Sequence, residues 1–197
     1  MGDKKRMDNT NKTIKLYSLQ TNIVKDKLFS DGIVYSKREY VRNKYQESAE
    51  VFIIVYDFLV KEMIKYIDKP AKAEYPYFHY MDLYNIEKYD NIKPLQLEVP
   101  LDEIVLFDYK TYTKVMTFKY LGENEDEEKE FECEIEKQGL NYYKIMMSNF
   151  YTQYKNKIIE SWKSLFRYNE DFKNGDYTKK ETGIMGASFR IKKEWIV

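Results

Sequence analysis

The sequence AEVFIIVYDFLVKEMIKYI, residues 49–67, carries the strongest helical pattern in the chain. Apolar side chains recur at every fourth position, and aromatic side chains widen the stripe that they form (Val51, Val55, Leu59, Met63; Phe52, Phe58, Tyr66). Pro70 follows, and proline stops a helix because it lacks the backbone N–H. An apolar face this wide on a helix this long predicts a central core helix rather than a surface helix.

Short runs with strand-like alternation flank this helix on both sides. Thr21 or Asn22 can cap a helix that Gly32 ends in the left-handed conformation, and Asp108 is placed to cap a helix through Met116. Residues 75–84 read as a loop or edge strand because Pro76 opens them. The remaining predicted elements are strands at 14–19, 33–35, 95–99, 104–107 and 183–191 and a helix at 149–168.

These elements predict one α+β domain over residues 13–197, with the helix at 49–67 packed on a curved, mostly antiparallel sheet. Residues 1–12 are polar and predict a disordered lead-in. Residues 121–138 contain a block of acidic side chains, which predicts a solvated surface insertion or hairpin.

The chain has very few histidine and cysteine side chains, and this restricts the catalytic and metal sites that it can form. The chain of 197 residues has one histidine, His79, and one cysteine, Cys133, so it lacks the three or four Cys and His ligands typical of a zinc site. We expect no metal site. Lys plus Arg and Asp plus Glu both number 33, so no net field attracts nucleic acid or an anionic membrane. One cysteine and no apolar run of membrane-spanning length predict a cytoplasmic protein.

Four blocks of sequence, in order, carry a family resemblance. They are Leu16–Gln20; Tyr56–Leu59 followed by Tyr75–Phe78; Leu97–Pro100 followed by Val105–Asp108; and Ser161–Phe166 followed by Ala187–Phe189 and Glu194–Val197. Together they resemble a bacterial family known as a domain of unknown function, number three thousand eight hundred and forty-one. The pattern is also similar, at the level of fold, to small ADP-ribosyltransferase-like domains, which bind NAD in a cleft between two small sheets.

The second resemblance implies roles for seven residues. Gln20 would anchor the nicotinamide amide, and Tyr75, Tyr77 and Tyr80, with His79 among them, would form an aromatic wall against the ring. Asp108 and Glu98 would be the carboxylates that stabilise a cationic, oxocarbenium-like ribose. One departure weakens catalysis: where family members carry a Gln near the end, this chain reads Met185-Gly-Ala-Ser-Phe189.

Four of these seven residues also have a simpler structural explanation. Asp108 can be a helix cap, and Glu98 can be the solvent-facing member of an alternating strand. Gln20 can meet a free backbone amide before the helix, and His79 can be an ordinary edge residue. Whether the chain is an enzyme therefore stays open, and NAD is the cofactor that the resemblance implies.

A second class of function is a protein-interaction module without catalysis. The abundance of tyrosine, 20 residues of 197, suits an interface, and a mobile-element protein that binds and inhibits a host factor would have such a composition. A third class, nucleic-acid binding, has local support in the lysine-rich C-terminal segment (Lys179, Lys180, Arg190, Lys192, Lys193), although lysine on a solvated face is the usual case.

Overall fold

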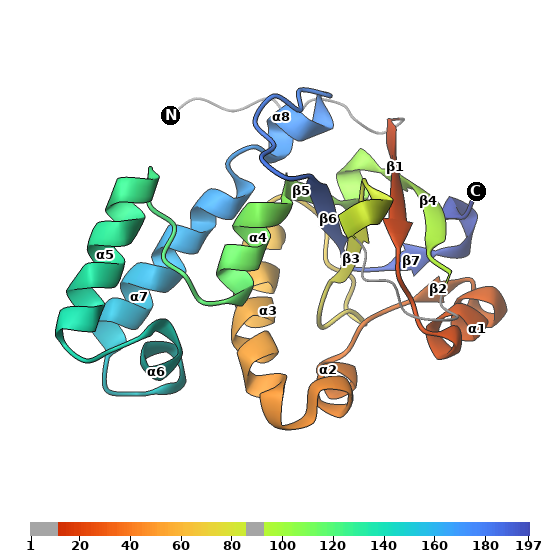
Figure 1. Ribbon diagram of the computed structural model, residues 1–197. Coiled ribbons are helices and arrows are strands. Elements are labelled where there is room, and N and C mark those ends of the chain that lie inside the picture. Colours follow the sequence, from red (N-terminus) through yellow and green to blue (C-terminus); the bar gives the residue numbers. More distant parts are fainter. Residues whose placement is uncertain (1–11, 86–92) are drawn as a thin grey trace.

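A five-stranded antiparallel sheet forms the centre of the protein (Figure 1). The computed structural model describes residues 12–85 and 93–197, so the predicted lead-in lies outside the described residues except for Lys12. The strand order is β4-β1-β3-β6-β5, with β1 at Thr13–Ser18, β3 at Tyr77–Tyr80, β4 at Leu95–Pro100, β5 at Val105–Asp108 and β6 at Ile184–Ser188. A second, two-stranded sheet pairs β2 (Ile33–Val34) with β7 (Ile191–Lys192).

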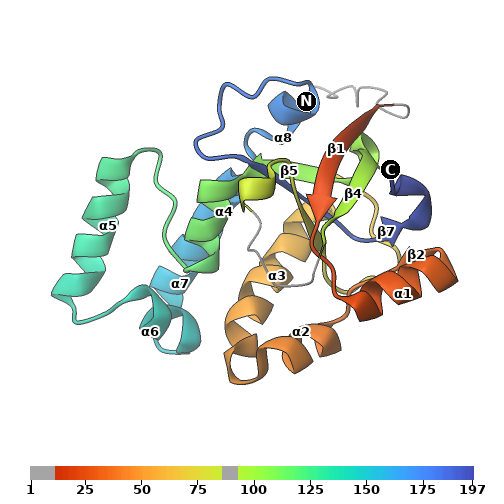
Figure 2. The ribbon, with the colours of Figure 1, turned by 45° about the vertical axis from the view of Figure 1, so that its right-hand side comes forward.

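Helices cover both faces of the central sheet. Helices α5 (Glu125–Lys137), α6 (Tyr142–Met147) and α7 (Thr152–Ser161) extend away from the sheet and form a helical lobe (Figures 1 and 2). The helices are α1 (Asn22–Asp31), α2 (Arg38–Tyr45), α3 (Ala49–Met63), α4 (Tyr109–Met116), α5 (Glu125–Lys137), α6 (Tyr142–Met147), α7 (Thr152–Ser161) and α8 (Asn169–Lys173). A 3-10 turn at Trp162–Phe166 continues α7. No helix within the described residues is long and apolar enough to cross a membrane.

Strand alternation gives the sheet two faces with different partners, because successive side chains of a strand point to opposite sides. We call one the His79 face; it carries Leu16, Ser18, Tyr77, His79, Leu97, Leu106, Gly186 and Ser188. The other, the Phe78 face, carries Tyr17, Phe78, Tyr80, Glu98, Phe107, Met185 and Ala187. The register that aligns these residues pairs Tyr17 with Tyr80 and His79 with Gly186.

The Phe78 face packs against α3 and α4 and, beyond them, against the helical lobe. Leu59 and Met63 of α3 are fully buried there, as the pattern at 49–67 predicts. Trp162 is also fully buried, with Phe58 edge-on at 5.3 Å between ring centroids, and its indole N–H donates to the carbonyl of Lys119 at 2.8 Å. This cluster therefore joins the sheet and the lobe into one core.

The His79 face packs against α1, α8 and the two-stranded sheet. Leu28 of α1, Val34 of β2, Ile191 of β7 and Phe172 of α8 are all buried in this second cluster. The two antiparallel sheets are thus packed together on this side of the protein.

The structure confirms the predicted fold class and several predicted element ends. The Thr21 hydroxyl accepts the backbone N–H of Val24 at 3.4 Å, and Gly32 ends α1 with a left-handed φ of 77°. The helix predicted over 49–67 ends earlier as a regular helix, at Met63, and turns continue it to Ile67.

Two predicted elements are wrong. β3 is not a loop or edge strand, since it lies between β1 and β6 with aromatic side chains packed on its Phe78 face. The acidic segment is not a hairpin but contains α5, whose Phe131 and Ile135 are buried against the lobe while its acidic side chains face outward or towards lysines. A third element, α2, occupies a stretch that the sequence pattern left irregular.

Candidate functional site

The structure separates the seven predicted site residues into groups. Gln20 and His79 both meet Ser18 on the His79 face, because the Gln20 amide donates to the Ser18 hydroxyl and the Tyr17–Tyr80 register places Ser18 beside His79. Tyr77 lies on the same face of β3, two residues before His79. These residues lie on strands next to the packed two-stranded sheet, since Tyr77 shares its cluster with Val34 and Ile191. The end of β1 that carries Gln20 is therefore the candidate site.

A chain of hydrogen bonds runs behind this site. The Gln20 amide nitrogen donates to the Ser18 hydroxyl at 3.0 Å, and that hydroxyl donates to the Phe78 carbonyl at 3.2 Å. On the other side of β3, the Ser188 hydroxyl lies 2.7 Å from His79 Nε2 and donates to the Arg190 carbonyl at 2.7 Å. Three strands are thus tied together by polar side chains inside an apolar core.

These bonds assign the tautomer of His79. The single proton of Ser188 is used on Arg190, so Nε2 of His79 must be the donor to Ser188 and Nδ1 carries no proton. Nδ1 is buried and has no hydrogen-bond partner among the described residues. Opposite the ring, Gly186 leaves no room for a side chain, since an added Cβ would come within 2.6 Å of Ile104 Cδ1.

Burial sets the protonation states at the site. His79 is fully buried, and the loss of water lowers the pKa of its imidazole to about 3. The ring is therefore neutral near pH 7 and acts as a hydrogen-bond donor rather than as an acid–base group. Burial likewise raises the pKa of the Tyr77 phenol, and the nearby Tyr40 phenol raises it further.

An ion pair closes the same end of the sheet. Both the Nε and Nη2 groups of Arg190 donate to the Glu103 carboxylate, the first at 2.8 Å, and Lys192 lies 3.4 Å from it. Bidentate arginine–carboxylate pairs are geometrically specific. Arg190 is therefore committed to Glu103, which leaves it unsuited to the phosphate contact considered for the C-terminal segment.

The two predicted carboxylates are not brought together. Asp108 is buried on β5, where Oδ1 caps α4 by accepting the Thr111 N–H at 3.1 Å and Oδ2 accepts the backbone N–H groups of Glu181 and Thr182 at 2.8 and 3.3 Å. Glu98 lies on the opposite face of the sheet and pairs with Lys15 at 3.4 Å. The predicted capping role of Asp108 is confirmed.

Tyr75 and Tyr80 also lie away from Gln20. The Tyr75 hydroxyl donates to Asp57 of α3 at 2.8 Å, and its ring packs edge-on to Tyr56 at 5.4 Å. Tyr80 is on the Phe78 face, 6.2 Å from the Tyr109 ring. Of the predicted aromatic wall, only Tyr77 lies on the face of the sheet where Gln20 meets Ser18.

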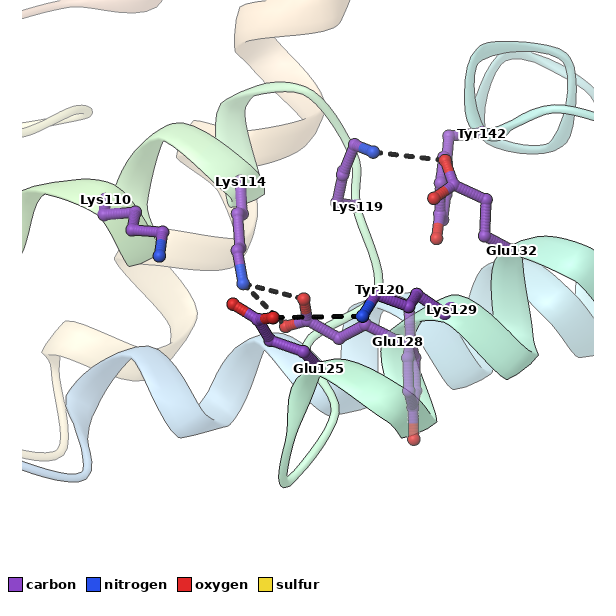
Figure 3. Close-up of a pocket in the computed structure, with 9 residues that line it drawn as sticks. All are labelled: Lys110, Lys114, Lys119, Tyr120, Glu125, Glu128, Lys129, Glu132 and Tyr142. Carbon is purple, nitrogen blue, oxygen red and sulfur yellow. Dashed lines mark hydrogen bonds and ion pairs between the residues drawn. The ribbon is translucent and has the colours of Figure 1, made fainter.

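A cavity of about 160 Å³ lies between α4 and α5 (Figure 3). Lys114 binds both oxygens of Glu128 at 2.7 and 2.9 Å, and Lys119 binds Glu132 at 3.1 Å. Figure 3 shows these lysines and glutamates facing one another across the gap. Because these charges pair with each other, the ion pairs across the cavity hold the acidic helix α5 against α4 and the segment that follows α4. Within the described residues, no group of three or more His, Cys, Asp or Glu side chains could hold a metal ion.

Comparison with known proteins gives one finding. The model of the family described as "Domain of unknown function (DUF3841)" matches residues 15–197. No curated protein and no solved structure matches the chain. The matched segment runs from β1 to the end of the chain and takes in both sheets and all eight helices of the described structure. The chain therefore belongs to the DUF3841 family.

Proposed function

We propose that this protein binds NAD or a related nucleotide at the Gln20 end of β1, as an ADP-ribosyltransferase-like domain that lacks a complete catalytic centre. The observation that carries the proposal is that Gln20, through its hydrogen bond to Ser18, meets the His79 face of β3, next to the place where the two antiparallel sheets pack together. Such domains hold NAD between two small sheets, which is the arrangement that the resemblance implies.

Gln20 has the chemistry to recognise a carboxamide. Its Nε2 is held by Ser18, so the amide plane is fixed, while its Oε1 has no hydrogen-bond partner among the described residues and can accept the N–H of a nicotinamide amide. Tyr77 is on the same face of the sheet, and the nearby Tyr40, which is 44% exposed, offers a further aromatic surface. His79 stabilises the site because its hydrogen bond with Ser188 joins β3 to β6.

The placement of the acids favours binding over transfer. Stabilising an oxocarbenium-like ribose takes a carboxylate close to the sugar. Asp108 is saturated with backbone N–H groups on another strand, and Glu103, at this end of the sheet, is neutralised by Arg190. These residues therefore support recognition of the nicotinamide amide without cleavage of its glycosidic bond.

Replacing Gln20 by alanine tests this proposal. We expect wild-type protein to bind NAD in isothermal titration and Gln20→Ala to bind it about tenfold or more weakly, because a buried amide–amide hydrogen bond is lost. Gln96→Ala is the matched control, since Gln96 is an exposed glutamine on β4. No binding of NAD by the wild type, or equal binding by Gln20→Ala, contradicts the proposal.

A second candidate, a protein-interaction module with a host protein as partner, rests on a different surface. Phe150 is 90% exposed at the start of α7, and Tyr143 and Met147 of α6 are also exposed, at 61% and 40%. Clustered exposed apolar side chains of this kind mark interaction sites.

The change Phe150→Ser tests this second candidate. If the surface binds a host protein, cross-linking in bacterial lysate should yield a discrete adduct that Phe150→Ser removes, because the apolar anchor is lost. Ile23→Ser is the control, since Ile23 is 81% exposed on α1, away from the lobe. An adduct that survives Phe150→Ser, or that Ile23→Ser also removes, excludes the α6–α7 surface as the binding site.

A further inference from the structure

A second cavity, of about 350 Å³, lies where the start of β1 meets the end of α8. Its volume is at the lower end of the range for small-molecule sites. Its lining combines polar and apolar residues: Lys12, Thr13, Ile14, Leu101, Phe172, Lys173, Asn174, Gly175 and Tyr177. Unlike the cavity between α4 and α5, this one has no acidic side chain in its lining.

Lys173 is the unusual residue of this cavity. It is only 9% exposed, yet within the described part of the chain its ammonium group forms no hydrogen bond and no ion pair. Glu170 and Asp102 act on its charge from a distance, but burial has the larger effect and lowers the pKa of Lys173. Because Lys173 lines the cavity and its nitrogen is not among the fully buried polar atoms, the unpaired ammonium group is available to an anion in the cavity.

The other lining groups suit the rest of such a ligand. Lys12, at the rim, adds a second positive charge. The carboxamide of Asn174 and the hydroxyl of Thr13 offer neutral hydrogen bonds, since neither is paired among the described residues. The ring of Tyr177, which is partly buried, packs on the buried Phe172 ring at 6.4 Å and a tilt of 48°, so the aromatic wall of the cavity is the ring of Tyr177. Charge, polar groups and aromatic surface therefore meet in one small space.

We propose that this cavity binds the phosphate group of a small organic ligand, of mononucleotide size or smaller, with Lys173 and Lys12 as its cationic ligands. Two ammonium groups without an arginine fork suit a compact dianion such as phosphate. The aromatic wall takes the organic part. The site is independent of the proposed NAD site, because it lies at the opposite end of β1, about 20 Å from Gln20 by strand geometry.

The probes are AMP, adenosine and inorganic phosphate, each titrated into the full-length protein by calorimetry. We expect AMP to bind and adenosine to bind at least about tenfold more weakly, since adenosine lacks the phosphate. Lys173→Met should lower the affinity for AMP about tenfold to a hundredfold. The variant should unfold at the same or a higher temperature than the wild type, because an unpaired buried charge is replaced by an apolar side chain of similar length.

Lys180→Met is the matched control, because Lys180 is exposed and outside the lining. It should bind AMP as the wild type does. The proposal is overturned if Lys173→Met binds AMP with unchanged affinity, if AMP and adenosine bind equally, or if neither AMP nor inorganic phosphate binds at millimolar concentration. AMP binding that Gln20→Ala removes and Lys173→Met preserves would overturn this site while supporting the one at Gln20.

Discussion

Replacing Asp108 by alanine is expected to lower the free energy of unfolding by about 2–4 kcal/mol, the largest effect of any single carboxylate considered in this protein. Loss of the cap on α4 costs about 1 kcal/mol. The remainder comes from the backbone N–H groups of Glu181 and Thr182, which lose their acceptor. Urea unfolding followed by circular dichroism measures the change.

Glu98→Ala is the matched control for Asp108→Ala. Glu98 makes a single ion pair with Lys15 at the surface, so its removal should change the free energy of unfolding by less than about 1 kcal/mol. An unchanged or increased stability of Asp108→Ala would contradict the structural role, since active-site residues often cost stability. Asp108 would then again be a candidate catalytic carboxylate.

Acidification is expected to destabilise the protein through His79. The unfolded imidazole titrates near its ordinary pKa of about 6.5, whereas the folded imidazole has a pKa of about 3. Between these values the unfolded state binds one more proton than the folded state, so stability falls as the pH falls. The slope is about 1.4 kcal/mol per pH unit within this window and vanishes above it, where both states are neutral.

His79→Gln isolates this contribution from that of the carboxylates. Glutamine keeps a nitrogen donor for Ser188 and cannot titrate. Urea unfolding of both proteins at several pH values between about 7 and 5 should give a steeper loss of stability for the wild type. Parallel pH profiles would mean that His79 gains its proton in the folded state, which contradicts a buried, neutral ring.

The separation of the seven site residues follows from strand alternation. Residues 77 and 79 point to one face of β3 and residues 78 and 80 to the other, so Tyr77 and Tyr80 could not line one wall. Once 77–80 is assigned as a strand, this part of the site can be predicted from the sequence alone. Glu98 and Asp108 lie on opposite faces only because of the register across all five strands, which the sequence does not show.

The partners of His79 could not be predicted in this way. Ser188 is 109 residues away, and it meets the ring only because β6 is the neighbour of β3. Nothing local in the sequence around Ser18 or Ser188 distinguishes these buried hydroxyls from exposed ones. The same holds for Lys173, since its burial depends on the start of β1 meeting the end of α8.

Local signals identified the elements with clear caps and periodicity. Thr21, Gly32 and Asp108 act where capping chemistry placed them, and the core helix lies where its apolar stripe begins. The acidic helix α5 was missed because its charge density obscured an apolar pair, Phe131 and Ile135, at helical spacing. Its glutamates are stabilised by lysines of another element, which a local pattern does not contain.

The most direct test of nucleotide binding at the Gln20 end of β1 is a crystal structure of the protein grown with NAD. The account predicts density for the nicotinamide amide against Gln20 Oε1, with the ring beside Tyr77 and the glycosidic bond intact. An empty Gln20 end at saturating NAD, or a nicotinamide amide bound away from Gln20, would contradict it.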